Sequence, residues 1–320
     1  MPASGTIVWQ RPAGRGVTHA VMATGNVVIA ATSARSVTAI GAEAGALYWE
    51  RRVGGSIAGP PTSDGQRIYV STRARDGSVY AIDPVSGHRI WSRRVGDVRT
   101  AAVHVAHLVL AGTARGELVA LDDSTGDIRW RTQLMGAVAT APAAHGMHAF
   151  VATETDTLYR ISLRDGVIEA RVPIGATPSA PPAVQDDLLV LALHSREVAA
   201  YSLPSLRERW RVTLDDVPLA RPVWDGDAVM VSTRTASIWR IENGANARRV
   251  AHPGGTTTTS FMGADGRFVL GRLDGSLICF ERDGRELWRV QLGSSIVAAA
   301  TVLDGALFVG LLDGNVVRIR

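Results

Sequence analysis

The segment AIDPVSGHRIW, residues 81–91, returns in the same plan as ALDDSTGDIRW, residues 120–130. Each copy has a small residue first, an aspartate two residues later, a Ser/Thr-Gly pair, and a tryptophan four residues after the glycine. Asp83 and Asp122 can accept hydrogen bonds from the backbone of their own turn. The glycine supplies a positive φ or room for a neighbouring backbone. The pattern therefore predicts a tight turn that leads into a strand carrying a tryptophan.

The same spacing recurs along the whole chain in steps of 38 to 42 residues. That is about the length of one blade of a β-propeller. In two copies Ala170 and Val250 stand where tryptophan is expected, and in one copy Leu206 replaces the glycine. Each tryptophan is expected to lie between blades, where an indole buries about 150–250 Å². The predicted inter-blade anchors are Trp9, Trp49, Trp91, Trp130, Trp210 and Trp288.

The two ends of the chain complete one further unit. The residues after Trp288 and those up to Trp9 together have the length of one repeat. Within each unit the hydrophobic pattern has a period of two, and turn pairs such as Asp64-Gly65 separate the runs. We therefore predict an all-β fold. Residues 1–320 are expected to form a single domain, an eight-bladed propeller of four-stranded antiparallel blades, closed by the N-terminal strand joining the C-terminal blade.

Composition limits the kinds of partner. All 34 basic residues are arginine, 30 residues are acidic, and the two kinds are interspersed along the chain. A nucleic-acid-binding protein usually concentrates its positive charge on one face, so specific nucleic-acid binding is not expected. The lone Cys279 allows no internal disulfide. No apolar run approaches the roughly 20 residues of a membrane helix, so no membrane insertion is expected.

The repeat resembles the pyrroloquinoline-quinone-like, or tryptophan-docking, propeller family over the whole chain. That family includes quinoprotein alcohol dehydrogenases, the propeller lipoprotein of the bacterial outer-membrane-assembly machine, and propeller domains of bacterial signalling proteins. The resemblance implies, for an enzyme, a chain about twice as long with inserted loops, a calcium site and an adjacent-cysteine pair. This sequence has short connections and a single cysteine. We therefore expect no enzyme activity, no cofactor and no catalytic residue.

Two His-x-x-His pairs have a spacing that is compatible with metal ligands: His104 with His107, and His145 with His148. Residues three apart on one strand point to opposite faces, which is unfavourable for chelation. The prediction is that these histidines face solvent near turns and hold no metal.

Charged residues in the loops between successive blades are the candidate binding site, because these loops are expected to crowd around the axis. They could hold a partner's loop or a small ligand, or merely solvate the mouth of the channel. A second open possibility is an arginine-rich rim on the outer strands that meets an acidic partner or phosphate. The predicted binding residues are Arg15, His19, Asp97, Arg99, Asp215, Asp216 and Arg221.

The favoured function is a non-catalytic protein-interaction platform or scaffold in a bacterial assembly, monomeric on its own, whose partner is another protein with an acidic surface. One alternative is a ligand-sensing domain of a signalling system, and the least favoured is a quinoprotein-type oxidoreductase. The resemblance implies that the outer-membrane role needs a signal peptide and a lipidated cysteine. Neither is visible in this sequence. A cytoplasmic location is therefore expected.

Overall fold

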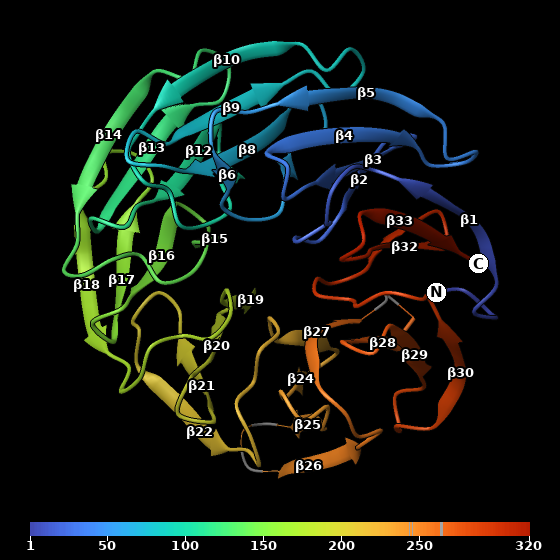
Figure 1. The fold of residues 1–320 in the computed structure, drawn as a ribbon. Coiled ribbons are helices and arrows are strands. Elements are labelled where there is room, and N and C mark those ends of the chain that lie inside the picture. The colour runs from blue at the N-terminus through green and yellow to red at the C-terminus, as the bar shows by residue number, and fades with distance from the viewer. Residues whose placement is uncertain (243, 245, 263–264) are drawn as a thin grey trace.

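A computed structural model describes residues 1–242, 244, 246–262 and 265–320. Eight antiparallel sheets stand around a central axis, and the chain passes through them in order (Figure 1). Regular structure in this described part of the chain consists of strands, and no helix in it has the length and hydropathy to cross a bilayer. The predicted eight-bladed propeller is confirmed.

We number the blades along the chain and give the strands from the axis outward. Blade 1 contains β2 (Met22–Thr24), β3 (Val27–Ala31), β4 (Ser36–Gly41) and β5 (Leu47–Arg52). Blade 2 contains β7 (Thr62–Ser63), β8 (Ile68–Arg73), β9 (Ser78–Ile82) and β10 (Arg89–Arg94), and β6 (Ser56–Ile57) pairs with β8 as well. Blade 3 contains β11 (Val103–Val105), β12 (Leu108–Gly112), β13 (Glu117–Asp122) and β14 (Ile128–Gln133). Blade 4 contains β15 (Ala143–His145), β16 (His148–Thr153), β17 (Thr157–Ser162) and β18 (Ile168–Pro173).

The second half of the ring repeats this plan. Blade 5 contains β19 (Ala183–Gln185), β20 (Leu188–Ala192), β21 (Glu197–Ser202) and β22 (Glu208–Thr213). Blade 6 contains β23 (Val223–Asp225), β24 (Ala228–Ser232), β25 (Ile238–Glu242) and β26 (Asn246–Ala251). Blade 7 contains β27 (Thr257–Met262), β28 (Phe268–Arg272), β29 (Ser276–Phe280) and β30 (Glu286–Gln291). Blade 8 contains β31 (Thr301–Leu303), β32 (Ala306–Gly310), β33 (Asn315–Ile319) and, from the other end of the chain, β1 (Ile7–Pro12).

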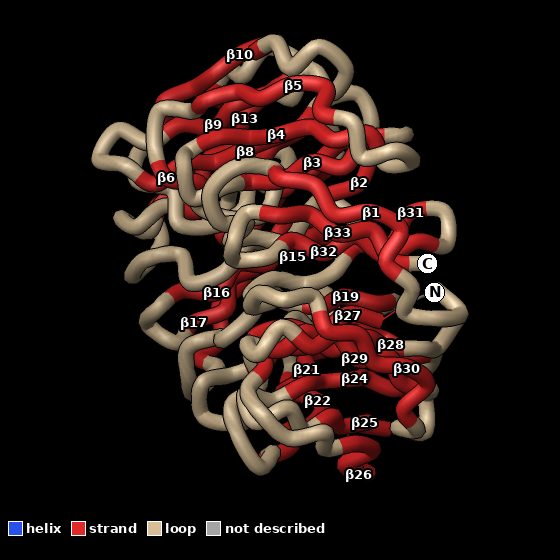
Figure 2. The backbone as a smooth tube through the Cα atoms, turned by 45° about the vertical axis from the view of Figure 1, so that its right-hand side comes forward, coloured by secondary structure: helices blue, strands red, loops and turns tan. Residues whose placement is uncertain are grey.

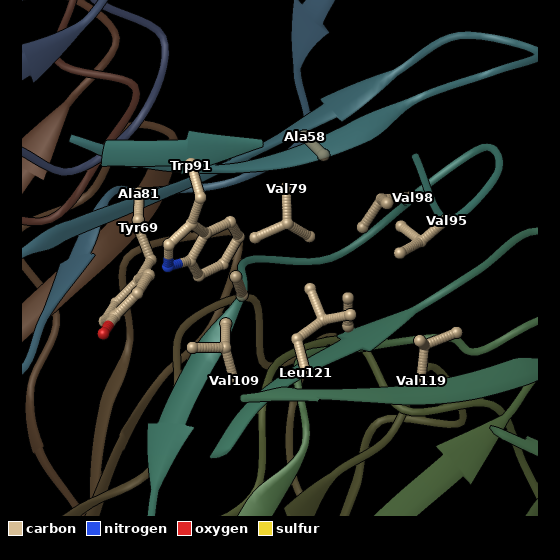
Figure 3. Close-up of a cluster of buried hydrophobic side chains, with 12 residues drawn as sticks. Ala58, Tyr69, Val79, Ala81, Trp91, Val95, Val98, Val109, Val119 and Leu121 are labelled. Atoms are coloured by element: carbon tan, nitrogen blue, oxygen red, sulfur yellow. The ribbon is translucent and has the colours of Figure 1, made fainter. Parts of the chain in front are cut away.

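Burial changes from the middle of a blade to its rim. Every residue of β4 is buried, because neighbouring blades cover both faces of the middle strands. In the outermost strand β10 only Trp91 is buried, and its neighbours are exposed or half-buried. The anchor is thus the main apolar contribution of the outer strand to the contact between blades 2 and 3 (Figure 3).

Each anchor packs against a glycine in the turn of the next blade, and most anchors also donate a hydrogen bond to that turn. A side chain on Gly126 would come within 2.6 Å of the Trp91 ring, so this glycine leaves room for an indole as well as taking a φ of +73°. The indole N–H donates to a backbone carbonyl of the next blade's turn in five cases: Trp9 to Glu43, Trp49 to Pro84, Trp91 to Asp123, Trp130 to Leu163 and Trp288 to Pro2.

At the contact between blades 4 and 5 the anchor position has a small residue and the turn position has a large one, the reverse of the other contacts. Ala170 takes the place of the tryptophan, and Leu206 takes the place of the glycine. Leu206 keeps the left-handed backbone of the glycines, with φ +57°, and its side chain is buried in a cluster against which Ala170 packs. The leucine therefore fills space that an indole occupies elsewhere, which offsets the cost of its backbone conformation.

The ring closes through the two ends of the chain, which lie side by side (Figure 2). Trp9 pairs with Arg318 in the β1–β33 ladder, and Thr6 and Arg320 exchange two backbone hydrogen bonds of 3.1 and 2.8 Å. The amino group of Met1 adds an ion pair of 3.1 Å to Asp265. The predicted closure of the C-terminal blade by the N-terminal strand is confirmed.

Candidate functional site

A cavity of about 950 Å³ lies on the axis of the ring. The innermost strands and the ends of the loops that precede them supply its wall, which is rich in alanine and proline. Small residues suit this position, since strands from all blades converge there and leave little room for large side chains. The long polar and charged side chains of the wall are His19, Arg99, His104, His145, Gln185, Asp186 and Arg221.

Three of the predicted binding residues reach this axial cavity: His19, Arg99 and Arg221. His19 Nε2 lies 3.2 Å from the carbonyl of Ile57, and burial lowers the pKa of this histidine. Arg99 forms an ion pair of 3.0 Å with Glu154.

Arg221 is the unusual member of the wall. Its side chain is exposed to the cavity, and desolvation by the surrounding protein lowers the pKa of its guanidinium. Within the described residues it has neither an ion pair nor a side-chain hydrogen bond. A guanidinium carries five donors and a permanent charge, so Arg221 offers an anionic group a partner that the chain itself does not use.

The other four predicted residues lie away from this wall. Asp215 accepts hydrogen bonds from Ser237 Oγ at 2.5 Å and Trp239 Nε1 at 3.0 Å, and Asp216 forms an ion pair of 2.9 Å with Arg234. The backbone carbonyl of Arg15 accepts a hydrogen bond from the N–H of Ser33, and that of Asp97 accepts one from the N–H of Ala114. Both donors lie in the turn between the second and third strands of the blade that follows the loop. The loops between blades run inward from the rim, so only their inner ends meet the axis.

The histidine pairs are placed differently from the prediction. His104 Nε2 lies 3.0 Å and His107 Nδ1 lies 3.4 Å from the same carboxylate oxygen of Asp123. The two rings converge because a tight turn, with positive φ at Ala106 and His107, separates them and reverses the chain. The expectation of opposite faces assumed one straight strand and is wrong for this pair.

The second pair flanks the equivalent turn of blade 4. His145 and His148 are direct cross-strand partners. His148 lies 3.0 Å from Glu169, whereas His145 is exposed at the axial cavity. The expectation of solvent contact therefore fits His145 and not His148.

Asp64, His104 and Asp123 place one potential ligand atom each within 4.8 Å of one another. Arg67 already enters this group, at 2.8 Å from Asp64 and 3.9 Å from Asp123. Tyr69 donates a further hydrogen bond of 2.7 Å to Asp64. The guanidinium supplies the positive charge that half-buried Asp64 and buried Asp123 need, so we assign this cluster to the contact between blades 2 and 3.

Sequence reasoning missed His104, His145, Gln185 and Asp186 as members of the cavity wall. In the sequence, the His-x-x-His spacing of the two histidines suggests only a metal site. A better signal was available, because each lies within the short innermost strand of its blade.

Comparison with known proteins identifies the family. The family model described as "Outer membrane protein assembly factor BamB" matches residues 1–107, 75–169 and 238–320, which together exceed half of the chain. The chain belongs to this family. The tryptophan-docking resemblance is thereby confirmed.

Two relatives carry the same name. The BamB of Xanthomonas campestris pv. campestris is 26% identical over 190 residues, which are 55% of this chain and 46% of the relative. The BamB of Nitrosomonas eutropha is 30% identical over 135 residues, which are 40% of this chain and 32% of the relative. The matches thus span less than half the length of these BamB relatives.

Two solved structures share the fold. The crystal structure of BamB from Moraxella catarrhalis superposes with a TM-score of 0.81 at 17% identity, covering 98% of this chain and 97% of the other. The computationally designed Ika8 protein superposes with a TM-score of 0.84 at 14% identity, covering 96% and 97%. At these identities the likeness supports the architecture and carries no functional residue across.

The expectation of a cytoplasmic protein is wrong. The family and the BamB relatives are named for the assembly of outer membrane proteins. The expectation rested on the first residues of the sequence, and these are no guide to location in a chain that matches only part of its relatives.

Proposed function

We propose that this chain is a non-catalytic scaffold that binds another protein during assembly of outer membrane proteins. Membership of the BamB family supports this function, because the names of the BamB relatives state a role in assembly and no reaction. The rigid ring suits a scaffold, since every blade is fixed to the next by buried contacts. The absence of enzyme activity remains a prediction.

The axial cavity is the proposed binding surface, and unpaired Arg221 is the observation that carries this choice. Among the described residues of the wall, two arginines, Arg99 and Arg221, face the cavity and one carboxylate, Asp186, does so. A partner loop with an acidic residue would pair with Arg221 and exclude solvent around the pair, which strengthens it. Arg15 is proposed to steer the acidic partner at the rim of this face. Asp97, Asp215 and Asp216 would repel an acidic residue, and Asp215 and Asp216 already bond within blade 6.

A charge reversal on the axis tests both the function and the face. The tagged chain would be purified from the organism that makes it, as wild type, as Arg99→Glu/Arg221→Glu, and as the control Arg171→Glu/Arg209→Glu, which reverses two exposed arginines of the outer strands. A stoichiometric partner is expected with wild type and control, and at least about tenfold less of it with the axial variant. Partner binding that is unchanged in the axial variant would reject this face.

The function itself is tested by removal of the gene. Outer membrane proteins, quantified by mass spectrometry of the membrane fraction, are expected to fall and to recover when wild-type chain is supplied. Unchanged levels would reject the assembly role. The isolated chain is proposed to be a monomer, because arginine-rich outer strands oppose edge-to-edge association, and light scattering measures this directly.

A further inference from the structure

A second cavity, of about 420 Å³, opens on the outside of the ring between the outer parts of blades 1 and 2. No carboxylate is among the residues that line it, whereas three arginines and a histidine are. We call it the outer crevice. Its lining residues are Arg51, Arg52, Tyr80, Ile82, His88 and Arg89.

The arginines of the outer crevice have no acidic partner among the described residues, and Arg51 is held by a backbone carbonyl. Arg51 Nε donates a hydrogen bond of 2.7 Å to the carbonyl of Gly87, which leaves its two terminal nitrogens for another partner. Across the part of the chain that the structure describes, Arg51, Arg52 and Arg89 form no ion pair. The nearby Asp83 is occupied by its own turn, where it accepts hydrogen bonds from Val85 and Ser86.

The next contact around the ring shows the same arginine with an acidic partner. Arg93, which corresponds to Arg51, donates the same 2.7 Å hydrogen bond to the carbonyl of Gly126 and in addition pairs with Asp127. His88 occupies the position of Asp127 in the repeat. A histidine in place of this acid therefore leaves the positive charge of the outer crevice unbalanced.

A further arginine is added at the same place. Arg89 of blade 2 occupies the position that Ile128 has in blade 3, and it lines the outer crevice together with Ile82, its partner in the ladder. Arg129 of blade 3, which forms an ion pair of 2.6 Å with Asp122 of its own turn, has Ile90 as its counterpart in blade 2. The positive charge is thus concentrated in a hollow rather than spread along the rim.

We propose that the outer crevice binds a phosphate-bearing anion. Guanidinium groups recognise phosphate oxygens through paired, charge-assisted hydrogen bonds, and here the three come from two blades and converge. Tyr80 adds polarity to the floor, because its hydroxyl oxygen accepts a hydrogen bond from Gly54 N–H at 3.0 Å and its own proton can face a ligand. The phosphate could be free or part of a lipid headgroup.

Three variants separate this site from general surface charge. Arg52→Gln/Arg89→Gln removes two cations and leaves the hydrogen bond of Arg51 to Gly87 intact. His88→Asp restores the acid that the next blade contact has, and is expected to pair with Arg51 without loss of folding. Arg171→Gln/Arg209→Gln is the matched control, because it removes two exposed outer-strand arginines elsewhere on the ring.

Binding would be measured by calorimetry with inorganic pyrophosphate in about 0.05 M salt, where charge interactions are little screened. Sedimentation with phosphatidylcholine vesicles, with and without phosphatidic acid, tests the lipid source. Wild type and control are expected to bind pyrophosphate or the phosphatidic acid vesicles. Both crevice variants are expected to bind at least about tenfold more weakly.

Binding to pyrophosphate alone would assign a soluble phosphate compound, and binding to vesicles alone would assign a headgroup. The proposal is overturned if wild type binds neither probe, or if the control loses as much affinity as the crevice variants. Melting temperatures of all variants, measured without ligand, show whether a loss reflects unfolding. Failure here would leave the axial scaffold proposal untouched, because the two sites share no residue.

Discussion

Replacing Gly126 by alanine tests how the blades are held together. A Cβ at this position would lie 2.6 Å from the Trp91 ring, and the residue has a φ of +73°. The left-handed conformation costs an L-residue about 1–2 kcal/mol, and overpacking a buried contact costs about 1–3 kcal/mol more. We therefore expect Gly126→Ala to lower the free energy of unfolding by about 2–5 kcal/mol. Urea denaturation followed by far-ultraviolet circular dichroism measures this change.

A matched glycine separates the two costs. Gly146 has a φ of +56° and no atom within 4 Å of its Cβ position, so Gly146→Ala should cost only the backbone part. In a Trp91→Leu background, Gly126→Ala should likewise fall toward the Gly146→Ala value, because the ring is gone. If the cost of Gly126→Ala is the same with and without the indole, the tryptophan contact is not the reason for the glycine.

Further predictions concern three other places. Ala170→Trp should destabilise the fold by about 1–3 kcal/mol through overpacking. Adding Leu206→Gly should recover most of that loss in the same urea assay. If stability does not recover, Leu206 does not fill the space that an indole occupies at the other contacts. Hydrogen bonds, led by that from Ser124 Oγ, hold the pKa of Asp122 well below its usual range. Stability from this group is present above about pH 4 and lost on further acidification, so the melting temperature of wild type should fall more steeply there than that of Asp122→Asn; parallel curves would contradict this. Burial raises the pKa of the Cys279 thiol to about 11, so iodoacetamide at about pH 8 should label it slowly until urea is added, as mass spectrometry would show; fast labelling of the native protein would contradict its burial.

The architecture could be predicted from the sequence because one spacing recurs along the chain. The spacing of glycine and tryptophan fixes the blade length, and the closure follows once the last and first residues are counted as one unit. The role of the glycine was only half predicted, because the atoms that crowd Gly126 belong to a tryptophan in another repeat, 35 positions earlier in the chain. No single repeat contains both partners of that contact.

The site was harder to predict than the fold. Asp215 and Arg221 lie in one connecting segment, yet Asp215 bonds the rim of blade 6 and Arg221 reaches the axis. The two residues differ in their distance from the axis, because the segment runs inward from the rim. The type of a residue alone does not predict that distance. The outer crevice was also hidden, because Arg51 and Arg52 have counterparts in Arg93 and Arg94, and the difference lies in His88 and Arg89, which belong to the partner blade.

Because β1 pairs with β33, the first strand to be synthesised can pair only after the last strand has been made. On the ribosome, residues 7–12 emerge long before their ladder partners at 315–319 exist. Ile7 and Val8 remain exposed even in the finished ring, so this segment has apolar surface to shield throughout synthesis. Closure of the ring therefore requires β1 to pair with a strand about 300 residues away in sequence, and such long-range pairing slows folding. Until then, a chaperone that holds unfolded chains has a defined segment to protect.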